Sequence, residues 1–243
     1  MITLFSASNA LCKWLKLNLP RLPVGEGQRV GVVPLLTNSE MITWQCHVMF
    51  TDSWRERATV IAVEAHSRFT LLIPFDVVPS QDKLEKVICE QWANELVSLA
   101  IKHGELDRDA IPRVFTQFYE RVKEVSWVRN MDMSVQGHVS DAEQWVRDTL
   151  AGRGLDALDD ELAQDISWHI NSLNKAAKGV DGHKRSFYPI PLFVEDGLYR
   201  FAHDVSSVGN HPNPYMNTQT QNNLSQSADS VISFADYLVR QRE

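Results

Sequence analysis

The feature that most constrains the fold is a series of three apolar segments between residues 43 and 74. In the first, 44–50, large apolar residues or cysteine occupy every second position, which is typical of a β-strand. The second, 58–63, is apolar on both faces, so we expect a central strand covered on both sides. The third, 69–75, carries Pro74 near its end, where a strand end or edge tolerates proline. Short polar connections join the segments, so the sequence predicts an antiparallel meander.

Segments with helical spacing of apolar residues surround this sheet. The strongest is 81–104, where Ser80 suits the start and Gly104 the end of a helix. Further helices are expected at 10–17, 108–122 and 158–177, and further strands at 2–5, 30–36 and 124–128. Residues 187–193 contain two prolines, so we expect an extended edge or arm there.

Residues 134–137 are interpreted as a tight connection, because Gly137 allows backbone geometry that other residues resist. Ser140 or Asp141 would then cap the next helix, which carries Trp145. The alternative is a ligand loop that presents backbone amides at the helix start.

The composition of the 243 residues bounds the function classes. A hydrophobic content of 44% is enough for a substantial core, and the net charge of −7 argues against broad binding to nucleic acid. The three cysteines form no metal or redox motif, so we expect free, buried thiols in a reducing compartment. No leader and no run of about 18 apolar residues is evident, so we expect a cytoplasmic protein without membrane contact.

The chain is predicted to have two parts. Residues 1–154 would form an α+β domain, in which helices pack on a small, mostly antiparallel sheet. Residues 155–243 would form a mainly helical extension. Within it, 203–227 is polar enough for a long loop or a disordered segment, and 231–239 has the spacing of a terminal helix.

The order of elements resembles an uncharacterised bacterial domain-of-unknown-function family. Members have a short strand with a Leu-rich helix, a W-x-A-N strand, an Arg/Lys turn, and an apolar run closing on proline. The corresponding segments are 1–17, 44–47, 55–57 and 71–74. The later family signature, K-T-N-N-R-S-V-L-G-S-M-N-D, aligns with 129–141. It matches at Ser134, Val135, Gly137 and Asp141 but not in its Asn-Asn-Arg centre; the Ala-Asn after the tryptophan is also absent. The resemblance covers about residues 1–150 and implies a fold but no activity.

One helical segment carries a potential metal-binding pattern. Glu161, Asp165 and His169 are spaced by four residues, so they share one helix face. Carboxylate and imidazole groups at this spacing can share a divalent metal, the one cofactor that the sequence suggests. The alternative is a solvated helix face without a ligand, because one helix still needs ligands from a partner element.

A basic and aromatic cluster offers a second candidate site. His183, Lys184 and Arg185, with Tyr188, could hold a phosphate group or stack on a base. A solvated loop is the alternative. His47 and His66 lie on or near the sheet, where a histidine satisfied by its neighbours is expected more often than a functional pair.

These observations favour a non-catalytic binding or protein-interaction module. No phosphate loop, nucleophile elbow or zinc motif is present, and no sequence feature pairs a serine or cysteine with a base. The polar segment and the terminal helix suit contact with a protein partner or a second copy of the chain. One alternative is a metal-dependent hydrolase that uses Glu161, Asp165 and His169. The second alternative is a weak nucleic-acid contact through residues 183–185.

Overall fold

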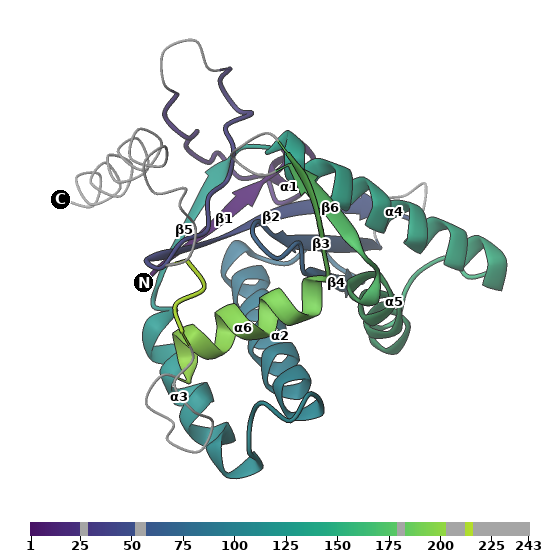
Figure 1. Cartoon of the computed structure of the whole chain (residues 1–243). Coiled ribbons are helices and arrows are strands. Elements are labelled where there is room, and N and C mark those ends of the chain that lie inside the picture. The colour runs from purple at the N-terminus through teal and green to yellow at the C-terminus, as the bar shows by residue number, and fades with distance from the viewer. Residues whose placement is uncertain (25–28, 52–56, 179–182, 203–211, 216–243) are drawn as a thin grey trace.

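A five-stranded mixed sheet forms the centre of an α+β fold (Figure 1). The structure is a computed structural model that describes residues 1–24, 29–51, 57–178, 183–202 and 212–215. Its strands lie in the order β4-β3-β2-β1-β5. Their bounds are β1 Ile2–Ala7, β2 Met41–Phe50, β3 Ala58–Glu64, β4 Thr70–Phe75 and β5 Glu124–Arg129.

The predicted meander is confirmed. β2 pairs antiparallel with β3, and β3 pairs antiparallel with β4, so that Ala62 lies opposite both Cys46 and Leu71. The remaining pairings are parallel: β1 runs parallel to β2 on one side and to β5 on the other. The predicted terminal strand at 2–5 and the strand at 124–128 are therefore both present.

Four helices cover one face of the sheet. They are α1 Asn9–Trp14, α2 Gln81–Lys102, α3 Ile111–Arg121 and α6 Pro189–Phe201, with a short 3-10 turn at Arg108–Ala110 before α3. Aromatic rings fill the space between them and the sheet. Trp92 of α2 packs against Trp44 of β2 and Phe201 of α6, with ring centroids 5.4 and 5.7 Å apart. This face holds the larger core, as the apolar stripe of α2 predicts.

Two helices, α4 Met133–Arg153 and α5 Asp160–Ser172, cover the opposite face (Figure 1). Val139 and Val146 of α4 pack with Ile61 and Val63 of β3 in a second core. All seven residues of β3 are buried, which confirms the prediction of a strand covered on both sides.

The predicted turn at 134–137 is wrong, since these residues form the first turns of α4. The helix begins at Asp132, whose Oδ1 accepts a hydrogen bond from Ser134 N at 2.7 Å. Ser140 and Asp141 lie inside the helix and cap nothing. Gly137 is accommodated in the helix because tertiary packing of the apolar face outweighs its unfavourable helix propensity. The hypothesis of a ligand loop with free amides at this position is therefore also wrong.

The second half of the chain corrects two further expectations. The helix predicted at 158–177 ends at Ser172, and β6 Lys175–Lys178 follows it. β6 pairs antiparallel with β7 Lys184–Phe187 in a separate two-stranded ribbon. The extended arm predicted at 187–193 is mostly α6, because its prolines fall in the first turn of the helix, where no backbone N–H is needed.

Residues 30–36 form an irregular segment instead of the predicted strand. Two side chains after β5 take the place of a partner strand. Asn130 accepts from Val33 N and donates to Val33 O, both at 2.8 Å, and Asp132 Oδ2 accepts from Leu35 N at 2.7 Å. These bonds satisfy the backbone groups that a sheet ladder would otherwise satisfy.

The described part of residues 155–202 shares both cores with the first half. Phe193 and Leu198 of α6 belong to the larger core, and Ile166 of α5 belongs to the smaller one. The predicted boundary near residue 154 therefore does not coincide with a separation of cores. The predicted helix at 231–239 and nearly all of the polar segment at 203–227 lie outside the described residues. Within the described residues, no helix combines the length and apolar character needed to cross a membrane.

Candidate ligand-binding cleft

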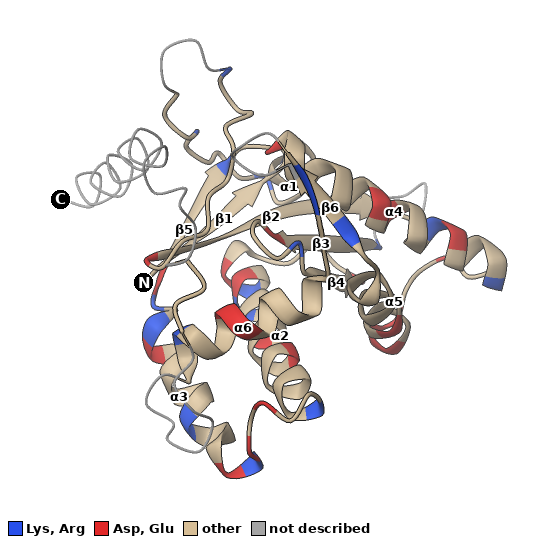
Figure 2. Ribbon diagram, viewed as in Figure 1, with Lys and Arg blue, Asp and Glu red and all other residues tan. Residues whose placement is uncertain are grey.

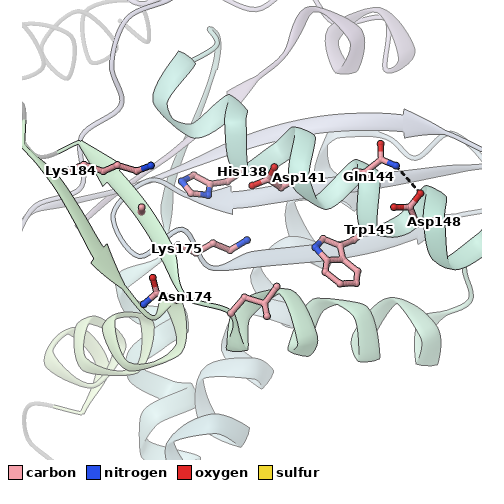
Figure 3. A pocket seen from close by; sticks show the side chains of 10 residues that line it. His138, Asp141, Gln144, Trp145, Asp148, Asn174, Lys175 and Lys184 are labelled. Carbon is pink, nitrogen blue, oxygen red and sulfur yellow. Dashed lines mark hydrogen bonds between the residues drawn. The ribbon is translucent and has the colours of Figure 1, made fainter.

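A cleft of about 570 Å³ opens between α4 and the β6–β7 ribbon (Figure 3). The volume is in the range of small-molecule sites in proteins. Its lining comes from α4, from the turn after α5 and from both strands of the ribbon: His138, Asp141, Gln144, Trp145, Asp148, Leu173, Asn174, Lys175, Ala176 and Lys184.

The helical repeat of α4 aims one row of side chains into the cleft. His138, Asp141, Trp145 and Asp148 are spaced by three or four residues, so they share one face. The adjacent apolar row, which includes Val139 and Val146, is buried against the sheet. Packing on the sheet therefore fixes the rotation of the helix and the direction of the row that lines the cleft.

The ribbon is held in place by the end of α5. Asn171 accepts from Thr70 N and donates to Thr70 O, both at 2.8 Å, which joins the last turn of α5 to the start of β4. Leu173 then adopts an extended backbone with ψ 146°, so the chain leaves the helix and enters β6. This change of direction places Lys175 at the side of the cleft that faces α4 (Figure 3).

Lys175 is a buried lysine at the inner side of the cleft, with only 7% of its surface exposed. It forms no ion pair within the described residues. Burial lowers the pKa of its ammonium group from the ordinary value, and the negative charge of Asp141 offsets part of that effect. Lys175 Nζ is not among the fully enclosed polar atoms, so the ammonium group reaches the open space of the cleft, where no carboxylate of the described residues forms an ion pair with it.

His138 lies beside Lys175 and is equally buried, at 7% exposure. Its Nδ1 has no hydrogen-bond partner in the described part of the chain. Burial lowers the pKa of the imidazole to about 4, and the positive charges of Arg68 and Lys175 act in the same direction. The ring is therefore neutral at pH 7. Buried polar atoms in proteins are nearly always paired, so this nitrogen is an exception within the described residues.

The rim of the cleft is mixed in charge and exposed. Asp141, Asp148 and Lys184 are exposed, and Asp148 accepts a 2.7 Å hydrogen bond from Gln144. Trp145, 39% exposed, forms an apolar wall and meets the ring of His169 edge-on at 4.6 Å. The two strands of the ribbon, with sequences KAAK and KRSF, contain four basic residues and no acidic one (Figure 2).

The residues predicted as a basic and aromatic site divide between two environments. Lys184 lines the cleft on β7, where its side chain extends toward His138 (Figure 3). His183, Arg185 and Tyr188 are exposed and do not line it. The nucleic-acid hypothesis for this segment stays a prediction.

Glu161, Asp165 and His169 lie on the exposed side of α5, on the shared face that their spacing predicts. Within the described residues, no group of three or more His, Cys, Asp or Glu side chains is arranged to hold a metal ion. The divalent-metal hypothesis thus receives no geometric support and stays a prediction.

Three distant residues form a serine–histidine–glutamate chain of hydrogen bonds on the sheet. His47 Nδ1 lies 2.8 Å from Ser8 Oγ, and His47 Nε2 lies 3.0 Å from Glu143 Oε1. The types match a nucleophile, a base and an orienting acid. Ser8, however, is 2% exposed, and its Oγ accepts from Leu11 N as the N-cap of α1. We therefore interpret the chain of bonds as structural: it fixes the start of α1 and joins β2 to α4.

His47 is thus a histidine satisfied by its neighbours, as expected for a sheet histidine. His66 does not face it: His66 is exposed, and its ring lies 5.3 Å from that of Tyr215.

Of the cleft residues, the sequence predicts a ligand contact only for Lys184. The sequence pattern predicts a helix over Lys175 and a turn just before His138, so nothing in it links the two.

Comparisons with protein-family models, with curated proteins and with solved structures find no match for the chain.

Proposed function

We propose that the chain is a non-catalytic binding protein that holds a small organic ligand in the cleft between α4 and the β6–β7 ribbon. The observation that carries the proposal is a pair of largely buried polar side chains at one cleft: Lys175, which forms no ion pair within the described residues, and His138, whose Nδ1 has no partner there. Trp145 and Leu173 supply the apolar surface that ligand sites combine with a few polar groups. This proposal makes specific the binding role that the sequence favours. Contact with a protein partner or a second copy remains a separate prediction.

Among the described residues that line the cleft, no hydrogen bond joins a nucleophile to a general base. The hydrogen-bonded serine lies outside the cleft lining, and the cleft carboxylates Asp141 and Asp148 are exposed. Ligand retention is thus the activity that these residues support best.

A fluorine-NMR fragment screen on protein containing 5-fluorotryptophan tests this function. We expect the Trp145 resonance to shift when a fragment binds. The Trp145→Phe variant assigns that resonance. Trp168 is the matched control, because it lies on neighbouring α5, is exposed to 37% against 39%, and does not line the cleft. Binding fragments that leave Trp145 unchanged, or a diverse fragment set without any binder, would refute the proposal.

A paired substitution on β6 provides a second test. Ala176 lines the cleft, whereas Ala177 is its neighbour on the same strand and does not. Ala176→Leu should weaken fragment binding because the added side chain occupies the cleft. Ala177→Leu should leave binding unchanged. Equal effects of the two variants would place the fragments elsewhere.

A further inference from the structure

The charged groups of the cleft are distributed unevenly between its buried and its exposed parts. Its buried groups are a lysine and a neutral histidine, and its carboxylates stand at the exposed rim. Burial of most of the Lys175 side chain disfavours its charged form, and an anion in contact with the ammonium group would offset that effect. Asp141 affects Lys175 through space, but the two form no ion pair. The inner end of the cleft is thus an electropositive position without its anion.

The surroundings strengthen this asymmetry. The β6–β7 ribbon brings Lys184 to the same cleft, and Arg68, buried to 7% exposure, adds positive charge behind His138. Asp148 accepts a hydrogen bond from Gln144 at the outer end and keeps its negative charge. Asp141 and Asp148 therefore both oppose the positive potential along the row that includes His138, and Asp132 and Glu64 act on the charge of Arg68. An anionic group that enters the cleft would be attracted to the two lysines.

We propose that the ligand of this cleft carries a carboxylate or phosphate group, which binds Lys175 beside His138, and an apolar or aromatic portion, which packs on Trp145. This inference rests on the proposed function and specifies its ligand class. The oxygen atoms of such a group accept from the Lys175 ammonium, and the imidazole of His138 can donate from a ring N–H. Leu173 and the Trp145 ring supply apolar contact on the outer side.

Binding of an anion reverses the electrostatics at both buried groups. In the free protein the positive charges of Lys175 and Arg68 disfavour a charged His138, and Asp141 alone favours it. A bound anion adds a second negative charge, so the pKa of His138 rises above about 4 and that of Lys175 returns toward its ordinary value. At a pH near either pKa, the ligand thus binds with proton uptake. Its affinity falls as pH rises through the pKa of Lys175 in the free protein, because the ammonium charge is lost.

Calorimetric titrations with matched probes test this inference. Benzoate, phenyl phosphate and neutral benzamide share an aromatic ring and differ in the group presented to Lys175. A charged hydrogen bond contributes about 1.5–3 kcal/mol, so we expect benzoate or phenyl phosphate to bind about ten- to a hundredfold more tightly than benzamide. The tighter of the two anions decides between the carboxylate and phosphate classes. Equal affinity for benzamide would overturn the inference but leave the proposed function intact.

Substitutions assign the effect to the residue. Lys175→Met keeps the length of the side chain and removes its charge, and it should abolish the preference for the anions over benzamide. Lys83→Met is the control, because Lys83 is exposed at the start of α2, far from the cleft lining. Removing an unpaired buried charge should also raise the melting temperature of the Lys175→Met variant. Retention of the full anion preference in Lys175→Met would refute the role of this lysine.

A separate readout follows the imidazole. With saturating anion, the proton-detected titration of His138 should move to higher pH than in the free protein. An unchanged His138 titration in the presence of bound anion would show that the anion does not lie beside it, and would overturn the inference.

Discussion

Substitution of Gly197 by alanine tests how closely α6 approaches α2. A Cβ built on Gly197 would overlap Cδ1 of Leu96 and lie 2.7 Å from its Cδ2. Leu96 is fully buried in the larger core, so its side chain has little room to move. Overpacking of this kind costs about 1–3 kcal/mol. Alanine also gains about 0.5–1 kcal/mol over glycine in a helix, so we expect a net loss of up to about 2 kcal/mol.

The same substitution at Gly137 isolates the packing cost. Gly137 lies within α4, and a Cβ there meets nothing within 4 Å, so only the gain in helix propensity applies. We expect Gly137→Ala to stabilise the fold by about 0.5–1 kcal/mol. Because the gain in helix propensity is common to both variants, their difference in unfolding free energy measures the cost of the overlap between a Cβ at position 197 and Leu96.

Urea unfolding followed by tryptophan fluorescence provides the assay, since Trp92 lies inside the core next to Leu96. A double-mutant cycle completes it. Leu96→Ala alone should cost about 2–5 kcal/mol, and adding Gly197→Ala to it should be neutral or stabilising, because the overlapping atoms are gone. Additive losses, or a Gly197→Ala variant as stable as Gly137→Ala, would refute the close approach of α6 to α2.

Three shorter predictions concern buried polar groups. Arg200 Nε lies 2.8 Å from the Asp196 carboxylate, and Asp196→Asn removes this counter-charge. The free energy of unfolding should fall by about 3–5 kcal/mol, and the double variant Asp196→Leu with Arg200→Met should recover most of the loss. The hydrogen bond from His47 lowers the pKa of Glu143 from the ordinary value of 4.5, so its stabilisation is present above that value and is lost as pH falls through the lowered pKa. Glu143→Gln should therefore flatten acid unfolding below the ordinary carboxyl pKa. Burial raises the pKa of Cys89 to about 12, so thiol reagents should label it only after unfolding.

The sheet was predictable because its evidence is local. Alternation of apolar residues in 44–50 and continuous apolarity in 58–63 identify a strand and a doubly covered strand without knowledge of the rest of the chain. The short connections between them predict the antiparallel order, which the structure shows. The same holds for α2, whose apolar stripe is long enough to be distinctive.

The start of α4 was not predictable in the same way, because two positions offer equivalent capping residues. Asp132 and Asp141 both suit an N-cap, and Gly137 between them favours a turn. Tertiary packing decides in favour of Asp132, since Val135 and Val139 are both buried against the sheet. At α6 the prolines suit two structures, because Pro189 is typical of a first helical turn as well as of an extended arm.

The cleft forms where α4 and the β6–β7 ribbon come together, and no local sequence pattern predicts that contact. His138 lies on α4, which precedes α5 in the chain, and Lys175 lies on β6, which follows α5. The strand that carries Lys175 has neither the length nor the apolar alternation of a typical strand. Lys184 was recognised only through its basic neighbours. Side chains that converge through tertiary structure leave no spacing in the sequence, so the inner end of the cleft required the fold.

The place of β1 in the sheet also bears on how the fold forms. Ile2 pairs with Met41 on one side and with Glu124 on the other, so the second pairing joins parts of the chain that are far apart in sequence. Closing so large a loop costs entropy before any contact compensates, so non-local strand pairs form late and slowly. The meander of β2, β3 and β4 can assemble earlier from neighbouring segments. Until β5 arrives, β1 presents an unpaired parallel edge, and that edge is where an unfinished molecule would associate with another chain.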